Sequence, residues 1–146
     1  MRNKPFYLLL ALTLIGFADA AYLTATHYLG QAPICSVAEG CDVVLSSDYA
    51  TVWGVPVALV GVAYYATLFL LLFYYRATGE KWKWDAFRAV IVAGFLVTAY
   101  LVYLQLAVIH AICQYCMLSA GLTTILLATI IVHRLMRKNN PPAERK

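Results

Sequence analysis

Charged residues are scarce in this chain of 146 residues, and their scarcity excludes an ordinary soluble domain. Asp, Glu, Lys and Arg together make up 12% of the sequence, whereas hydrophobic residues make up 63%. A soluble domain carries about 25% charged residues, and a soluble fold of this size cannot hide so much apolar surface from water. We therefore expect a membrane protein whose apolar side chains face the lipid bilayer.

Four stretches of the chain have almost no charge over a length sufficient to cross a bilayer, which takes about 20 apolar residues. The predicted spans are 6–26, 55–75, 89–109 and 112–132. The first contains one acid, Asp19, and the other three contain no Asp, Glu, Lys or Arg. This pattern predicts an all-α membrane protein with one domain over 1–146. Its four transmembrane helices would form a bundle, with a long extracytoplasmic loop at 27–54.

Basic residues are absent from one predicted side of the membrane. All 11 Lys and Arg residues precede the first span, separate the second from the third, or follow the fourth. Because short cytoplasmic loops are enriched in Lys and Arg, we expect both termini in the cytoplasm and a tail at 133–146. The net charge of +4 then reflects how the chain is oriented in an inner or plasma membrane. We expect no nucleic acid as a partner. A cleaved secretory signal near Ala20 is an alternative for the first span.

All four cysteines fall on the predicted outer side. Cys113 and Cys116 form a C-x-x-C motif at the start of the fourth span, where residues three apart share a helix face and the helix N-terminus favours the reactive thiolate. Cys35 and Cys41 lie in the outer loop, and we expect both to be accessible and mobile there. Two cysteine pairs on an oxidising face indicate a thiol–disulfide oxidoreductase.

Other interpretations of the cysteines stay open. Both pairs could be static disulfides of an exported loop, or all four thiols could bind zinc. The chain would then be a four-helix membrane scaffold with structural cysteines, or a metal-binding or transport protein. A transporter should carry Met or His ligands inside its spans, and no predicted span has a cluster of them. We therefore expect no metal.

The order of several residues resembles the vitamin K epoxide reductase family, in a bacterial-type form without a fused thioredoxin domain. After the loop cysteines come Ser47, Gly54-Val55-Pro56, Gly61 and Tyr64-Tyr65, and then the C-x-x-C motif. The resemblance extends from Tyr22-Leu23-Thr24 to the fourth span. It implies a bundle of four helices around a quinone pocket.

The resemblance also implies an electron relay. A reduced thioredoxin-fold protein would attack the loop disulfide at Cys35, Cys41 would attack Cys113, and Cys116 would face the quinone. That acceptor would be ubiquinone, menaquinone or phylloquinone, and the reoxidised partner would support disulfide-bond formation in exported proteins. Because the chain ends at Lys146 with no room for a thioredoxin-like domain, we expect the partner to be a separate protein.

Two comparisons refine this expectation. Animal relatives place an Asn before the second span and a Tyr after the C-x-x-C motif, and the nearest counterparts here are Ala50 and Ala120. This departure favours plain quinone reduction over epoxide reduction. A second bacterial family of disulfide-forming membrane proteins has its C-x-x-C motif before its spaced pair, whereas this chain has the reverse order.

Four residues are further candidates for quinone contacts. They are Ser47, Trp53, Asp19 and Tyr64. An acid inside a membrane is costly and is by default a functional hypothesis, although Asp19 could simply reach water. Ser47 could bind a thiolate or a quinone oxygen, or cap a turn. Trp53 could anchor the chain at the interface or cover the pocket, and Tyr64 could line the pocket or pack.

Overall fold

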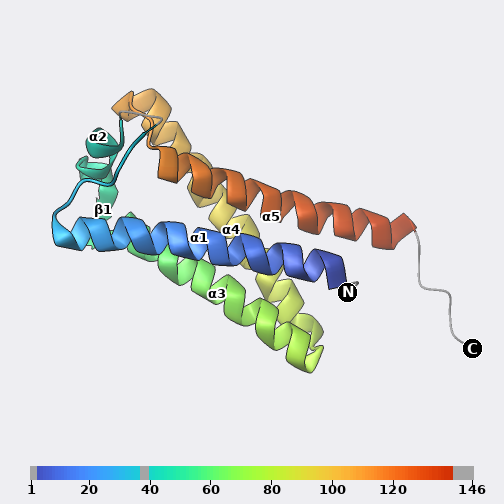
Figure 1. Ribbon diagram of the computed structural model, residues 1–146. Coiled ribbons are helices and arrows are strands. Elements are labelled where there is room, and N and C mark those ends of the chain that lie inside the picture. Colours follow the sequence, from blue (N-terminus) through green and yellow to red (C-terminus); the bar gives the residue numbers. More distant parts are fainter. Residues whose placement is uncertain (1–2, 37–39, 140–146) are drawn as a thin grey trace, which may run out of the picture.

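The computed structural model describes residues 3–36 and 40–139, which are mostly helical (Figure 1). The long helices are α1 (Asn3–Leu29), α3 (Val57–Thr78), α4 (Lys81–Tyr103) and α5 (Gln114–Asn139). Four helical segments are long and apolar enough to cross a membrane. The predicted class, a bundle of four transmembrane helices, is therefore confirmed.

The four helices form a closed ring in which each contacts two neighbours. α1 packs against α3 and α5, and α4 packs against the same two helices. The start of α1, the α3–α4 turn and the end of α5 lie at one end of the bundle, and the cysteine-bearing segments lie at the other (Figure 1). The helix segments at the first of these ends carry the basic side chains that the structure describes: Arg76, Lys81, Lys83, Arg88 and Arg134.

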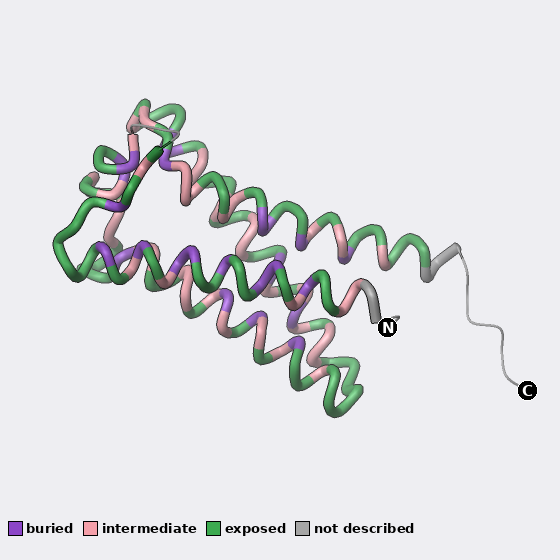
Figure 2. The backbone as a smooth tube through the Cα atoms, in the orientation of Figure 1, coloured by how far each residue is buried: buried purple, intermediate pink, exposed green. Residues whose placement is uncertain are grey.

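The half of the bundle nearest the termini is solidly packed. Its buried side chains are Leu9, Leu12, Leu68, Leu72, Phe87, Ile91, Leu126 and Ile130. Buried positions lie along the facing sides of the helices, and the outward sides are largely exposed (Figure 2). Exposed Leu and Phe side chains are stable there because lipid tails are as apolar as they are.

The connection between α3 and α4 is much shorter than the predicted spans imply. α3 ends at Thr78 and is capped by Gly79, which has a left-handed φ of 68° and donates its N–H to the Tyr75 carbonyl at 2.9 Å. A glycine adopts this conformation at no steric cost. α4 begins at Lys81, so most of 76–88 is helical. α5 likewise extends through 133–139 of the predicted tail, and 140–146 lie outside the described residues.

The cysteine-bearing end of the bundle contains local structure that the sequence pattern did not indicate. The loop after α1 forms α2 (Cys41–Leu45), a 3₁₀ turn η1 (Asp48–Ala50), and a hairpin of β1 (Thr51–Val52) with β2 (Val55–Pro56). Because Val55 and Pro56 pair in this hairpin, the second span begins at Val57 rather than at Val55. α4 continues into a π-helical turn, η2 (Leu104–Ile109), and then ends at His110, whose φ is 55°.

Tyr65 of α3 joins three helices in the middle of the bundle. Its hydroxyl lies 2.9 Å from the Ser119 hydroxyl of α5, and its ring lies where a Cβ on Gly16 of α1 would be. The absence of a side chain at Gly16 is therefore what admits the ring. Gly121 of α5, by contrast, has nothing within 4 Å of the position that its Cβ would take.

We predict that Gly16→Ala destabilises the bundle by about 1–3 kcal/mol, because its methyl group would overpack the ring of Tyr65. Thermal unfolding in detergent would show this as a lower midpoint. Gly121→Ala is the matched control, and its midpoint should stay equal or rise because Ala is the better helix former. An equal midpoint for Gly16→Ala and the parent would contradict the prediction.

Candidate redox site

The C-x-x-C motif lies at the N-terminus of α5, as predicted. Cys113 caps the helix, and its carbonyl accepts the Met117 N–H at 3.0 Å. The Cys113 sulfur accepts the Cys116 backbone N–H at 3.5 Å. Both side chains are unbonded thiols, with Cys113 buried and Cys116 half-buried. The helix start therefore directs an N–H group at the sulfur of Cys113 and favours its negative charge.

The thiol of Cys113 is acidic. A hydrogen bond from the Cys116 thiol contributes most, and the backbone N–H groups of Cys116 and Tyr115 add to it. Together they lower the pKa of Cys113 to about 7, against burial, which raises it. Since the thiolate is the nucleophile in disulfide exchange, this lowered pKa favours Cys113 as the reactive sulfur of the motif.

Cys35 and Cys41 form a disulfide with Cα atoms 6.4 Å apart. Cys35 is half-buried, but Cys41 is 0% exposed. The expectation that both loop cysteines are accessible is therefore wrong for Cys41. Only the Cys35 end of the disulfide is open to attack from solution.

Cys41 is buried because the start of α2 rests on the chain just before Cys113. A Cβ on Gly40 would lie 2.7 Å from the Ile112 nitrogen and 2.8 Å from its oxygen. Cys41, Val44 and Cys113 form one buried cluster, against which Cys35 and Cys116 pack. The structure thus brings the two cysteine pairs together, with Cys41 and Cys113 in the middle.

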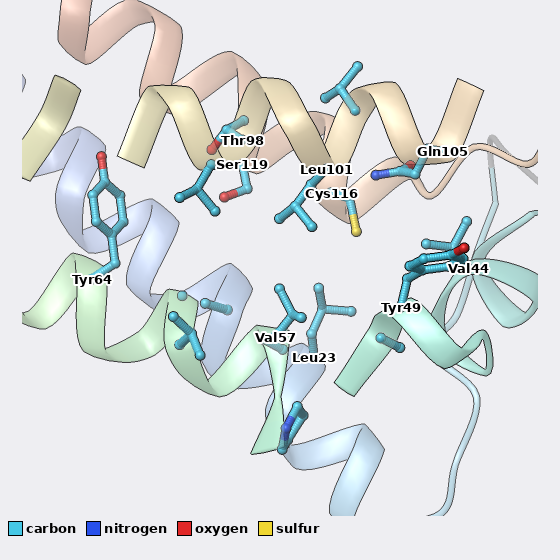
Figure 3. A pocket seen from close by; sticks show the side chains of 18 of the residues that line it. Leu23, Val44, Tyr49, Val57, Tyr64, Thr98, Leu101, Gln105, Cys116 and Ser119 are labelled. Atoms are coloured by element: carbon cyan, nitrogen blue, oxygen red, sulfur yellow. The ribbon is translucent and has the colours of Figure 1, made fainter. Parts of the chain in front are cut away.

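A cavity of about 380 Å³ lies below this cluster, between the four long helices and under α2 and η1. Its lining is mostly apolar and includes Leu23, Val57, Val97 and Leu101. Cys116 lines the cavity and Cys113 does not. Figure 3 shows the Cys116 sulfur directed into the hollow, with Gln105 near it and Tyr64 at the far end. The volume and the lining suit a small apolar ligand with few polar atoms.

Two buried polar atoms that belong to cavity-lining residues have no hydrogen-bond partner in the described part of the chain. They are Oδ2 of Asp19 and the hydroxyl of Tyr64. Thr123 lies near the Tyr64 hydroxyl but not in hydrogen-bonding geometry. An unpaired polar group in an apolar interior costs free energy, and this cost distinguishes Asp19 and Tyr64 from the other residues that line the cavity.

The four candidates for quinone contacts fall into two groups. Asp19, Tyr64 and Ser47 line the cavity, although the Ser47 hydroxyl also donates to the Val44 carbonyl at 2.7 Å. Trp53 does not line it. Trp53 is 100% exposed at the tip of the β1–β2 hairpin, where φ is 52°, so the structure places its ring away from the site.

No group of three or more His, Cys, Asp or Glu side chains is placed to hold a metal ion among residues 3–36 and 40–139. The sulfurs of Cys35 and Cys41 are bonded to each other, so neither is a thiolate ligand in this state.

The sequence of this chain is similar to the sequences of known proteins. The profile of the Vitamin K epoxide reductase family matches residues 7–131, which include α3, α4, most of α1 and α5, and both cysteine pairs. The chain belongs to this family. It is also similar to the thiol-disulfide oxidoreductase LTO1 of Arabidopsis thaliana, with 41% identity over 51 residues. That match covers 34% of this chain and 14% of the relative.

This member of the vitamin K epoxide reductase family has a further polar residue in its site that sequence reasoning missed. Gln105 of η2 is buried and lines the cavity. Its side-chain oxygen accepts the Cys113 N–H at 3.0 Å, which leaves its amide nitrogen on the cavity side (Figure 3). Gln105 therefore joins the reactive cysteine to the cavity. Its one signal in the sequence is an amide side chain inside an otherwise apolar span, where a polar group costs free energy.

We predict that the Cys113 thiol titrates with a midpoint near pH 7 in a Cys35→Ser/Cys41→Ser variant. The thiolate should form as the pH rises through that value, and its ultraviolet absorbance would follow it. Adding Cys116→Ala removes the strongest hydrogen bond, so the midpoint should move upward, toward that of an ordinary thiol of about 8.5. A midpoint that Cys116→Ala leaves unchanged would contradict the assigned cause.

Proposed function

We propose that the protein is a membrane thiol–disulfide oxidoreductase that carries electrons from a separate thioredoxin-fold protein to a quinone. The observation that carries the proposal is the position of Cys116, the one sulfur of the four that lines the cavity. Cys113 and Cys41 share one buried cluster, against which Cys116 packs, and Cys35 is the half-exposed end of the loop disulfide. The four sulfurs thus form a path from solution to the cavity.

Each transfer along this path is a thiol–disulfide exchange. A thiolate of the reduced partner attacks the Cys35 sulfur and releases Cys41 as a thiolate. The second thiol of the partner then attacks the partner–Cys35 mixed disulfide, which releases Cys35 and leaves the partner oxidised. Cys41 attacks Cys113 of a Cys113–Cys116 disulfide and releases Cys116. Cys35 finally attacks Cys41 and releases Cys113. The described state, with Cys35–Cys41 bonded and the other two thiols reduced, corresponds to the end of this sequence.

The cavity residues fit a quinone. When bound, a quinone accepts two electrons and two protons and becomes a hydroquinone. The unpartnered hydroxyl of Tyr64 is a donor suited to a quinone oxygen, and the amide nitrogen of Gln105 is a second donor, near Cys116. Asp19 places a carboxyl group on the same wall, where it can hold or pass a proton. The apolar lining excludes water from the site.

The charge pattern supports an orientation for this chemistry. The described basic side chains belong to the end of the bundle that bears the termini, which by the positive-inside rule faces the cytoplasm. The cysteines would then face the periplasm or an equivalent compartment, where disulfides persist. The relative named as a thiol-disulfide oxidoreductase favours the same chemistry, and oxidation of the partner would support disulfide formation in exported proteins.

We predict that the purified protein oxidises a reduced thioredoxin-fold protein only when quinone is present. Quinone absorbance and the thiol content of the partner would be followed together. Cys116→Ser should abolish quinone reduction, because it removes the sulfur that faces the cavity. A Met117→Leu variant, which changes an exposed residue outside the cavity lining, serves as the control. Normal turnover by Cys116→Ser would refute the path as drawn.

We also predict that Tyr64→Phe raises the KM for quinone about fivefold, because one neutral hydrogen bond contributes about 1 kcal/mol. The rate at saturating quinone should change less. Tyr100→Phe is the matched control, since Tyr100 is exposed on α4 and does not line the cavity. An unchanged KM for Tyr64→Phe would mean that its hydroxyl does not contact the quinone.

A further inference from the structure

The backbone of Ile34 is held between two helices by side chains at the cysteine-bearing end of the bundle. The Tyr115 hydroxyl of α5 donates to the Ile34 carbonyl at 2.7 Å, and the side-chain amide of Gln114 donates to the same oxygen at 3.3 Å. The Ile34 N–H donates to the Tyr22 hydroxyl of α1 at 3.3 Å. The rings of Tyr22 and Tyr115 have centroids 5.3 Å apart, so the two hydroxyl-bearing side chains support each other.

The positions of these residues connect the contact to the cysteines. Gln114 and Tyr115 are the two residues between Cys113 and Cys116, and Ile34 directly precedes Cys35. The middle of the C-x-x-C motif therefore binds the chain beside the loop cysteine that is open to solution. We refer to Tyr22, Gln114 and Tyr115 as the clamp.

The clamp acts through the backbone and not through apolar packing. The Ile34 side chain is 78% exposed, so it contributes little burial that would hold this segment in place. At the other end of the disulfide, Gly40 rests against Ile112 and is held by close packing. Cys41 is thus held by packing at the cysteine-bearing end of the bundle. On the Cys35 side, the three hydrogen bonds and the disulfide add to the burial of Pro33 and to the packing of Cys35 against the buried cluster.

The dependence on the disulfide matters because the proposed relay breaks it. While Cys35 and Cys41 are bonded, the disulfide tethers Cys35 close to the cluster. When the partner reduces that bond, the tether is lost. Cys35 must nevertheless return to attack Cys41 and release Cys113 as a thiolate. In that interval the clamp still binds the backbone of Ile34 and helps to keep the segment near its target.

We propose that Tyr22 and Tyr115 are positioning residues that hold Cys35 within reach of Cys41 after the loop disulfide has been reduced. This role rests on the proposed function and adds to it a reason for the two residues inside the C-x-x-C motif. Loss of one hydroxyl slows the return of Cys35, so that the Cys41–Cys113 mixed disulfide accumulates during turnover.

The test compares Tyr115→Phe and Tyr22→Phe with the parent and with Tyr28→Phe. Each substitution keeps the ring and removes one hydroxyl, and Tyr28 is an exposed tyrosine of α1 outside the cavity lining. The first measurement is amide hydrogen exchange of Ile34 and Cys35 in the reduced protein. Tyr115→Phe is the more informative variant there, because the Tyr22 oxygen that accepts the Ile34 N–H is still present. Exchange should rise about fivefold.

The second measurement quenches turnover with acid, blocks free thiols and maps the disulfides. The Cys41–Cys113 species should rise about fivefold in both Phe variants and stay at the parent level in Tyr28→Phe. The KM for quinone should not change. Because both tyrosines hold one residue, the double variant should show less than the product of the single effects.

Each outcome either supports or overturns the positioning role of the two tyrosines. Unchanged exchange at Ile34, or increased exchange without accumulation of the mixed disulfide, would overturn the positioning role and leave the relay intact. A Cys35→Ser variant tests the relay separately. It cannot resolve the mixed disulfide forward, since only Cys116 can reverse its formation, so the Cys41–Cys113 species should accumulate above the level in the parent. If Cys35→Ser yields no Cys41–Cys113 species, the relay is refuted and the positioning role fails with it.

Discussion

The close approach of α2 to the chain before Cys113 is the contact on which the rest of the site depends. Gly40 lies so near to the backbone of Ile112 that a side chain at this position would separate the two segments. That approach buries Cys41 and places it in one cluster with Cys113. It also makes α2 part of the roof of the cavity. A loop and a helix terminus far apart in the sequence become one site.

The bundle is packed in one half and hollow in the other, and side-chain size explains the difference. Large residues such as Phe87 and Leu126 fill the half near the termini. Around the cavity the lining includes Ala20, Ala58, Gly61 and Ala93, which leave room between the helices. Of the buried polar residues that the structure describes, Asp19, Gln105 and Thr123 line this space. Their cost in an apolar medium is high, so this concentration indicates a ligand site.

The main features of the fold follow from composition. Lengths of uncharged, apolar sequence predicted all four spans, because a bilayer requires about 20 such residues whatever their order. The ends of the spans were less predictable. Hydropathy cannot distinguish a helix start from the β2 strand at Val55–Pro56, and it cannot detect that α4 continues into the π-helical turn η2. Both features depend on local hydrogen bonds that apolar character does not encode.

The sequence by itself determined the membrane class, the number of spans, the two cysteine pairs and the placement of C-x-x-C at a helix start, because each depends on neighbouring residues. Only the tertiary structure decided which cysteine of each pair meets the other pair. It also decided the burial of Cys41, the hydrogen bonds of Gln105 and Tyr115, and the exposure of Trp53. These features depend on which helices pack against each other. How closely the backbones of distant segments approach is determined by tertiary packing, and the local sequence pattern does not encode it.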